Sequence, residues 1–144
     1  IRFKEEEVRA VGRTSMGVKG INLGKDDYVV GMEPVTSDKD YILAITENGF
    51  GKRTEVEEYR QQGRSGKGIL TYKTTPKTGH IISIKIVNES DDIMLITDTG
   101  VVIRLNVKDI SVLGRNTQGV TLMRTSDGGK VISIAKIPQE ETEE

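Results

Sequence analysis

The chain has 144 residues, enough to bury one hydrophobic core, and no cysteine, which excludes disulfides and thiolate metal sites and is compatible with a reducing compartment. Its formal net charge is −1 at pH 7, but four glutamates follow Pro138, and without them 21 basic residues face 18 acidic ones. We therefore expect a mildly basic folded body and an acidic tail. No run of 18 apolar residues and no signal-like N-terminus is present, so the sequence predicts a cytoplasmic protein without a membrane partner.

The first segment with a local preference is residues 5–11. Its glutamate, arginine and alanine residues favour a helix, but the similar segments 56–62 and 107–113 are β-branched or polar and run up to a glycine. We expect no more than one helical turn in each of the three segments.

Short apolar runs separated by polar turns fill the rest of the chain. The pair Asn48-Gly49 tolerates the positive φ angles of a tight hairpin, and Thr99-Gly100 occupies the corresponding place later in the chain. These signals predict two sets of four strands, at residues 41–46, 50–54, 69–72 and 80–87, and at residues 93–97, 101–107, 120–123 and 131–137. Sixteen glycines and the absence of a sustained 3.6-residue period favour an all-β fold.

A repeat with a period of 51 residues organises these strands. The pairs Gly12-Arg13, Gly63-Arg64 and Gly114-Arg115 are each followed by a glycine five residues after the first. Residues 42–69 and 93–120 are identical at 9 of 28 positions without a gap. We interpret residues 1–137 as three repeats, the first of which lacks the strand that residues 41–46 supply in the second, and we expect residues 138–144 to be a disordered acidic tail.

The repeated frame resembles a known family. It reads Ile45-Thr46-Glu47-Asn48-Gly49 followed by Gly63-Arg64 and Gly68-Ile69, and it returns as Ile96-Thr97-Asp98-Thr99-Gly100 followed by Gly114-Arg115 and Gly119-Val120. This is similar to the C-terminal repeat of bacterial DNA gyrase A and of its topoisomerase IV paralogue. The resemblance implies a β-pinwheel, a six-bladed relative of the propeller that wraps DNA around its rim. This chain would then form about three four-stranded antiparallel blades cut from a larger polypeptide.

One glycine loop resembles the seven-residue box Gln-Arg-Arg-Gly-Gly-Lys/Arg-Gly that starts the DNA wrap in gyrase A. Five positions match, and the loop departs from the box at Gly63 and Ser65; its residues are Gln62, Gly63, Arg64, Ser65, Gly66, Lys67 and Gly68. Backbone N–H groups and cations in such a loop could hold a phosphate, while the bland alternative is a crossover between blades that needs glycine for its backbone geometry. The glycine spacing does not fit a Walker loop, so nucleotide hydrolysis is not expected.

Two sets of arginines keep the period. Arg13, Arg64 and Arg115 suit a stripe of cations that follows a curved DNA backbone. Arg2, Arg53 and Arg104 keep step with Glu7, Glu58 and Asp109, so a repeated arginine–acid pair within each blade is the simpler explanation for them. The candidate DNA-binding residues are Arg13, Lys19, Lys52, Arg53, Arg60, Arg64, Lys67, Lys73, Arg104, Arg115 and Arg124.

No catalytic or metal site emerges from the residue pattern. His80 is the only histidine and heads an apolar strand, so a structural role is favoured, and none of the four tyrosines stands in a strand-cleaving motif. Aromatic residues make up 4% of the chain, which disfavours a platform that stacks single-stranded bases. We therefore expect no catalysis and no cofactor in this chain. The resemblance implies a parent ATP-dependent type II topoisomerase that uses ATP and magnesium on other domains.

The expected function is to bind and bend duplex DNA around a basic rim in support of negative supercoiling. The implied partners are duplex DNA, the rest of gyrase A, and gyrase B in a heterotetramer. Two alternatives stay open: the same domain of topoisomerase IV, or a propeller that binds proteins and has no enzymatic role.

Overall fold

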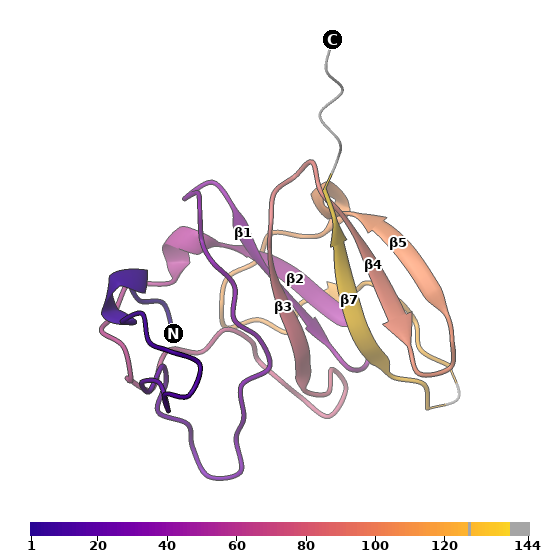
Figure 1. Ribbon diagram of the computed structural model, residues 1–144. Helices are drawn as coiled ribbons and strands as arrows, with labels where there is room; N and C mark the ends of the chain where they lie inside the picture. The colour runs from indigo at the N-terminus through magenta and orange to yellow at the C-terminus, as the bar shows by residue number, and fades with distance from the viewer. Residues whose placement is uncertain (127, 139–144) are drawn as a thin grey trace.

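A computed structural model describes residues 1–126 and 128–138 (Figure 1). The strands are β1 (Tyr41–Thr46), β2 (Phe50–Glu55), β3 (Ile81–Val87), β4 (Asp92–Thr97), β5 (Val102–Asn106), β6 (Val120–Thr121) and β7 (Val131–Ile137). Three single 3-10 turns, η1 (Glu5–Glu7), η2 (Val56–Glu58) and η3 (Val107–Asp109), follow one another at intervals of one repeat period. The prediction of one helical turn per repeat is confirmed, and so is the all-β class. The predicted tail lies outside the described residues, except for Pro138.

Two antiparallel sheets carry the strands, in the orders β3-β1-β2-β6 and β5-β4-β7. In each sheet a hairpin closes on a glycine with a φ of +83°, at Gly49 and Gly100, and the preceding residue is not left-handed. The predicted hairpins are confirmed, and each needs only one left-handed residue, the glycine. The register shifts at Ile45/Thr46 and, one period later, at Ile96/Thr97, so even the strand irregularity repeats.

The four-stranded sheet takes its strands from two repeats. β6 belongs to the third repeat, yet it pairs with β2 of the second, through Phe50↔Thr121 and Gly51↔Val120. This corrects the expectation that one repeat supplies all four strands of a blade. The predicted strand at residues 69–72 is wrong, because these residues join neither of the two sheets.

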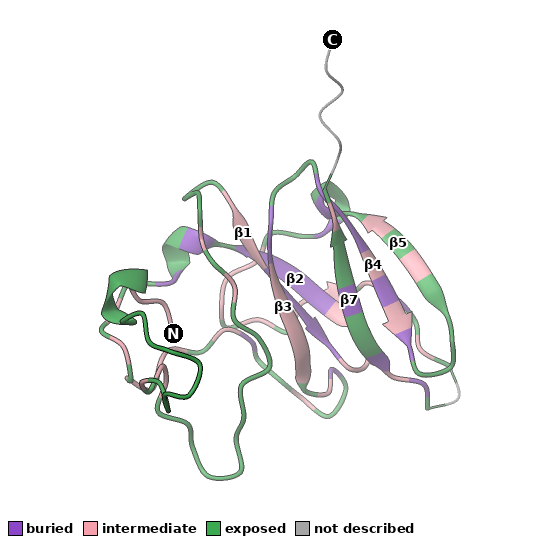
Figure 2. Ribbon diagram, viewed as in Figure 1, coloured by how far each residue is buried: buried purple, intermediate pink, exposed green. Residues whose placement is uncertain are grey.

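The core lies where the two sheets face each other, and Figure 2 shows the buried residues concentrated there. Leu43 and Ile45 of β1 pack with Ile93 and Leu95 of β4, each fully buried. By contrast, the first repeat has no strand among its described residues, and most of its side chains are exposed (Figure 2). Burial of apolar area therefore stabilises the second and third repeats far more than the first.

Candidate nucleic-acid interface

The three glycine loops close on the same backbone conformation. Gly17, Gly68 and Gly119 close the loops with φ angles of +74°, +78° and +70°. At Gly119 a side chain would also meet the backbone, because an added Cβ would lie 2.6 Å from the carbonyl oxygen of Gly51. The loops therefore need glycine for their conformation, as expected for a crossover between blades.

The second and third loops each dock on the preceding repeat. Gln62 N–H donates to the Arg2 carbonyl at 2.8 Å, and one period later Leu113 N–H donates to the Arg53 carbonyl at 2.9 Å. Short parallel bridges, Arg2↔Gln61 and Arg53↔Val112, mark the same contact. These loops are thus junctions between consecutive repeats.

The phased arginines Arg64 and Arg115 are half-buried in these junctions. Arg64 donates from Nε to the Glu7 carbonyl at 3.1 Å and from Nη1 to the Lys19 carbonyl. Arg115 donates from Nη1 to the Leu70 carbonyl at 2.9 Å, the same contact one period later. Each guanidinium therefore uses some of its N–H donors in hydrogen bonds within the protein, and only the remaining donors are available to a ligand.

The acids in register with Arg2 and Arg53 have a different partner from the one predicted. The Glu7 carboxylate accepts the backbone N–H of Arg64 at 2.7 Å, and the Glu58 carboxylate accepts that of Arg115 at 3.1 Å. The prediction of repeated pairs between these acids and the arginines of their own repeat is therefore wrong.

Arg2 and Arg53 instead reach across to the 3-10 turn of the next repeat. Arg2 donates to the carbonyls of Val56 and Tyr59, and Arg53 donates to those of Lys108 and Ile110. Their acidic partners, Asp38 at 3.4 Å and Glu89 at 3.1 Å, also occupy equivalent positions in the repeat. Arg104 alone pairs with an acid of its own sheet, Asp92, at 2.7 Å.

Lys52 is fully buried, and its ammonium is enclosed by the third glycine loop. Nζ donates to the carbonyls of Gly114, Arg115 and Thr117 at 2.7, 2.6 and 3.3 Å, and to the Thr117 hydroxyl at 3.0 Å. It also lies 4.8 Å from the centre of the Tyr72 ring. Burial lowers the pKa of Lys52 to about 8, an effect that the nearby Glu58 carboxylate opposes.

Lys52 and Arg53 therefore do not belong to a DNA-facing surface, which corrects two of the candidate residues. A signal for Lys52 was present in the sequence, because the same register position holds Ile1 and Ile103. A cation in an apolar register position indicates an internal role. No comparable signal distinguished Arg53.

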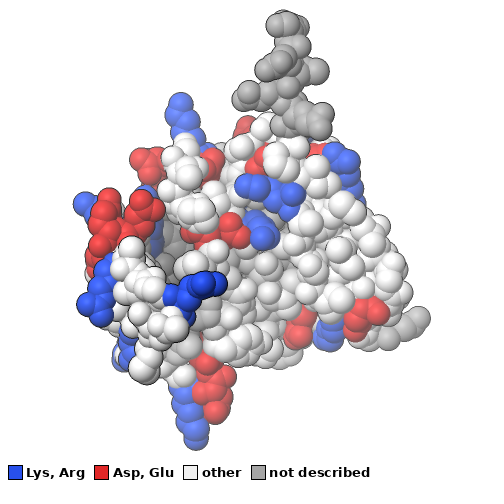
Figure 3. All heavy atoms as spheres, in the orientation of Figure 1, with Lys and Arg blue, Asp and Glu red and all other residues white. Residues whose placement is uncertain are grey.

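The remaining candidates are at the surface. Those with exposed side chains are Arg13, Lys19, Arg60, Lys67, Lys73, Arg104 and Arg124. On the face drawn in Figure 3, basic and acidic side chains are interspersed over the first repeat, while a largely uncharged area covers the lower parts of β3 and β7. This face therefore carries no continuous basic stripe among the described residues.

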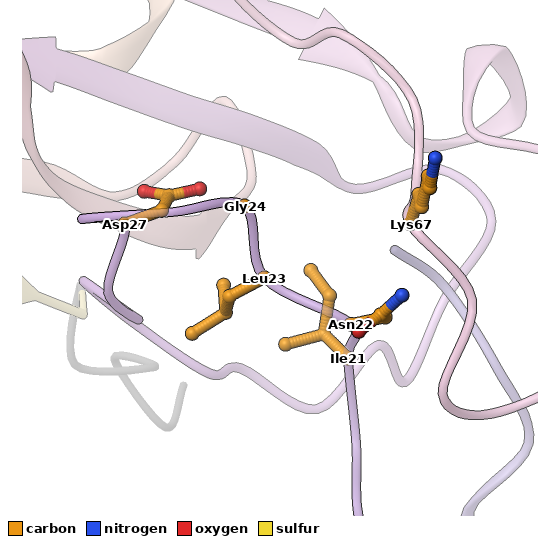
Figure 4. Close-up of a pocket in the computed structure, with 6 residues that line it drawn as sticks. All are labelled: Ile21, Asn22, Leu23, Gly24, Asp27 and Lys67. Carbon is orange, nitrogen blue, oxygen red and sulfur yellow. The ribbon is translucent and has the colours of Figure 1, made fainter.

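A shallow pocket of about 240 Å³ lies where the first repeat meets the second glycine loop (Figure 4). The segment at residues 21–24 and Asp27 line one side, and Lys67 lines the other. Asn22 N–H joins the two sides by donating to the Gly66 carbonyl at 2.8 Å. Lys67 thus stands exposed at the edge of a junction whose backbone is fixed.

The box-like loop contains two local irregularities. Ser65 has a φ of +65°, which is a conformation that glycine adopts readily and serine does not. This is one of the two positions where the loop departs from the gyrase box, in which it is glycine. Nε2 of Gln62 is buried with no hydrogen-bond partner among the described residues.

Replacing Ser65 with glycine should stabilise the protein by up to about 1 kcal/mol, because it removes the strain of a left-handed serine. Urea unfolding followed by circular dichroism measures the change. Asn116→Gly is the matched control, since Asn116 has the same register in the third loop and a φ that is not positive. Equal effects of the two substitutions would show that φ at Ser65 is not strained.

Other chemistry is sparse in the described part of the chain. His80 is exposed, and its backbone N–H and carbonyl both contact Glu47, which agrees with a structural role. The described residues contain no cluster of three potential metal-ligating side chains. Among those residues no helix is long and apolar enough to cross a bilayer.

Comparisons with known proteins agree with the period and the fold. A profile of the family described as DNA gyrase C-terminal domain, beta-propeller, matches residues 1–36, 40–88 and 91–138. DNA gyrase A of Staphylococcus epidermidis is 49% identical over 142 residues, which are 98% of this chain and 16% of that protein. The chain thus spans about one sixth of such a relative.

Two solved structures superpose closely on the chain. The C-terminal domain of DNA topoisomerase IV has a TM-score of 0.89 at 30% identity, over 94% of this chain and 42% of that one. A DNA gyrase A C-terminal domain has a TM-score of 0.87 at 27% identity, over 93% and 45%. The resemblance inferred from the repeated frame is confirmed.

Proposed function

The chain belongs to the DNA gyrase C-terminal domain family, and from this premise we propose that it binds duplex DNA along its glycine loops and bends it. The observation that carries the proposal is the period itself. Junctions with equivalent hydrogen bonds recur in consecutive repeats, and each contains a half-buried arginine, Arg64 or Arg115, with guanidinium donors left over. Equally spaced cations on successive repeats suit a phosphate backbone that curves from one repeat to the next.

In this proposal the protein contacts the phosphates of DNA and not its bases. Exposed Lys67, Lys73 and Arg60 flank the second loop, and Lys19 and Arg13 flank the first. Arg64 and Arg115 would contribute only the guanidinium donors that the junctions leave over. Since phosphate contacts carry no base information, we expect affinity to depend little on sequence and strongly on salt.

For the parent protein we propose DNA gyrase A, because the curated relatives carry that name at 45–49% identity. It would act with gyrase B as a type II topoisomerase in the cytoplasm, using ATP and magnesium on other domains. The chain itself would supply DNA bending that favours negative supercoiling, without a catalytic group or a cofactor. The topoisomerase IV domain remains the second candidate, on the strength of its close superposition.

A salt titration of binding to random duplex DNA tests the proposal. The logarithm of the association constant should fall linearly with the logarithm of salt concentration, by roughly 0.9 per neutralised phosphate. Lys67→Ala should reduce that slope by about one, because the Lys67 side chain is exposed and makes no hydrogen bond or ion pair with the described residues.

Lys39→Ala is the control, since Lys39 is an exposed lysine in the turn before β1 and does not belong to a glycine loop. An unchanged slope for Lys67→Ala would remove that residue from the interface. No binding by the parent chain at low salt would instead favour a propeller that binds proteins.

A further inference from the structure

Each of the two junctions contains a carboxylate that faces the loop proposed to bind DNA. Glu7 Oε2 accepts the Arg64 backbone N–H at 2.7 Å, and Glu58 Oε2 accepts that of Arg115 at 3.1 Å. Both acids are the last residue of a 3-10 turn, in η1 and η2, and both are exposed. An exposed acid beside a phosphate path opposes DNA binding by simple electrostatics, so its recurrence needs a physical reason.

The arginine of each loop adds side-chain hydrogen bonds to the same contact between consecutive repeats. Arg64 returns two donors to the preceding repeat, to the carbonyls of Glu7 and Lys19, and Arg115 returns one to that of Leu70. Backbone bonds lie alongside: Asn22 N–H to the Gly66 carbonyl, and Lys73 N–H to the Thr117 carbonyl at 3.0 Å. The acid and the arginine thus clip consecutive repeats together at the point where the loop begins.

We propose that Glu7 and Glu58 are positioning residues that fix the angle between consecutive repeats, and thereby the curvature of bound DNA. This rests on the proposed function. A hydrogen bond from an amide to a carboxylate is stronger than one between neutral groups, and it holds the backbone of the arginine itself. Without it, each loop keeps its glycine conformation but can tilt relative to the repeat before it.

The proposal makes a prediction opposite in sign to simple electrostatics. Removing a carboxylate makes the chain more positive, which by charge alone tightens DNA binding at low salt. If the acid positions the loop, its removal weakens binding, because the cations of neighbouring repeats no longer match one curved backbone. The sign of the change therefore separates the two roles.

The experiment compares Glu58→Ala with Glu57→Ala in the full chain. Glu57 is an exposed neighbour on the same turn and its side chain makes no hydrogen bond among the described residues, so both variants lose one equal charge. Binding to a random 40-base-pair duplex and its end-to-end distance by fluorescence energy transfer are measured at the same salt concentrations. Glu7→Ala against Glu6→Ala repeats the comparison at the first junction, where Ile1 takes the register position of Lys52.

We expect Glu58→Ala and Glu7→Ala to weaken binding about fivefold and to reduce DNA bending, which is the effect of losing one hydrogen bond. Glu57→Ala and Glu6→Ala should bind equally well or more tightly and bend DNA as the parent does. Glu58→Gln keeps an acceptor oxygen and loses the charge, so it should bend DNA nearly as the parent chain does. Thermal melting identifies any variant that has unfolded. In that case the comparison at the other junction tests the proposal.

The proposal is overturned if members of each pair behave alike, or if Glu58→Ala tightens binding as its charge alone requires. It is also overturned if Glu58→Gln loses as much bending as Glu58→Ala, since charge would then matter rather than contact. Failure of the proposed function has a different signature: the parent chain would neither bind nor bend the duplex at low salt.

Discussion

Replacing Lys52 with methionine should lower the free energy of unfolding by about 3 kcal/mol, the largest single effect that we expect on the third glycine loop. The fully buried ammonium satisfies the carbonyls of Gly114, Arg115 and Thr117. Methionine fills a similar volume and donates no hydrogen bond, so the Arg115 carbonyl loses its donor, while the Gly114 carbonyl keeps the Thr117 hydroxyl and the Thr117 carbonyl keeps the Lys73 N–H. Urea unfolding at pH 7, followed by circular dichroism, measures the difference.

The cost of Lys52→Met should also depend on pH. The folded pKa of Lys52 is lowered to about 8 from 10.5, so between these values the unfolded chain binds more protons at this residue than the folded chain does. Lys52 therefore makes the parent more stable as pH rises from 8 towards 10.5, and the methionine variant lacks this gain. The difference in stability between the two proteins should grow from pH 7.5 to pH 9.5.

Tyr72 acts in the opposite direction at higher pH. Burial raises its pKa to about 12, so its contribution to stability is lost between about pH 10 and 12. Both proteins contain Tyr72, and its effect cancels in the difference. Lys67→Met is the control for a lysine-to-methionine change at an exposed position and should alter stability by less than about 0.5 kcal/mol. A constant difference across this pH range would contradict a lowered pKa for Lys52.

Most strands and turns of the second and third repeats could be predicted from the sequence, because the residues that determine them are local. Gly49 and Gly100 end the hairpins where expected, and β1 and β4 follow the apolar runs within a residue. The single helical turns were also predictable, since glycine ends each segment soon after it starts. In each case the residues that specify the element are the residues that form it.

The partners of the charged residues could not be predicted in the same way. Register places Arg53 and Glu58 in one repeat, but Arg53 reaches the turn of the next repeat and Glu58 reaches the next loop. A period gives the spacing between equivalent residues and does not say whether a contact forms within a repeat or between two. The pairing of β6 with β2 could not be predicted for that reason, because this two-residue ladder joins strands of different repeats.

The same ambiguity affected the candidate interface. Arginines that recur once per repeat fit a phosphate stripe, and they fit equally well a junction that recurs once per repeat. The structure gives Arg64 and Arg115 a junction role through their contacts with Glu7, Lys19 and Leu70, while part of each guanidinium stays free. Lys67 lies in the same loop as Arg64 but does not keep the period, and its exposed side chain is therefore the more direct test of DNA contact.

The contrast between Arg53 and Arg104 gives the second large prediction. Both occupy the same position in consecutive repeats. The Arg53 side chain is 7% exposed, donates to Ile110 and Lys108, pairs with Glu89, and lies 4.6 Å from the Tyr41 ring centre. Arg53→Ala should therefore lower the free energy of unfolding by about 3 to 4 kcal/mol, since it removes charge-assisted bonds and leaves two carbonyls without a donor.

Arg104→Ala should cost less than Arg53→Ala, because the Arg104 side chain is 61% exposed and pairs with one carboxylate, that of Asp92, rather than with two carbonyls and a carboxylate. Urea unfolding of both variants, followed at the same wavelength, makes the comparison. Arg53→Lys should recover little of the loss, because a single ammonium cannot reproduce the fork that reaches two carbonyls and a carboxylate. Similar costs for Arg53→Ala and Arg104→Ala would mean that the contact between repeats contributes nothing beyond a surface ion pair. A much larger loss of unfolding free energy for Arg53→Ala would mean that contacts between repeats stabilise the protein. The glycine loops and their arginines lie at the same junctions.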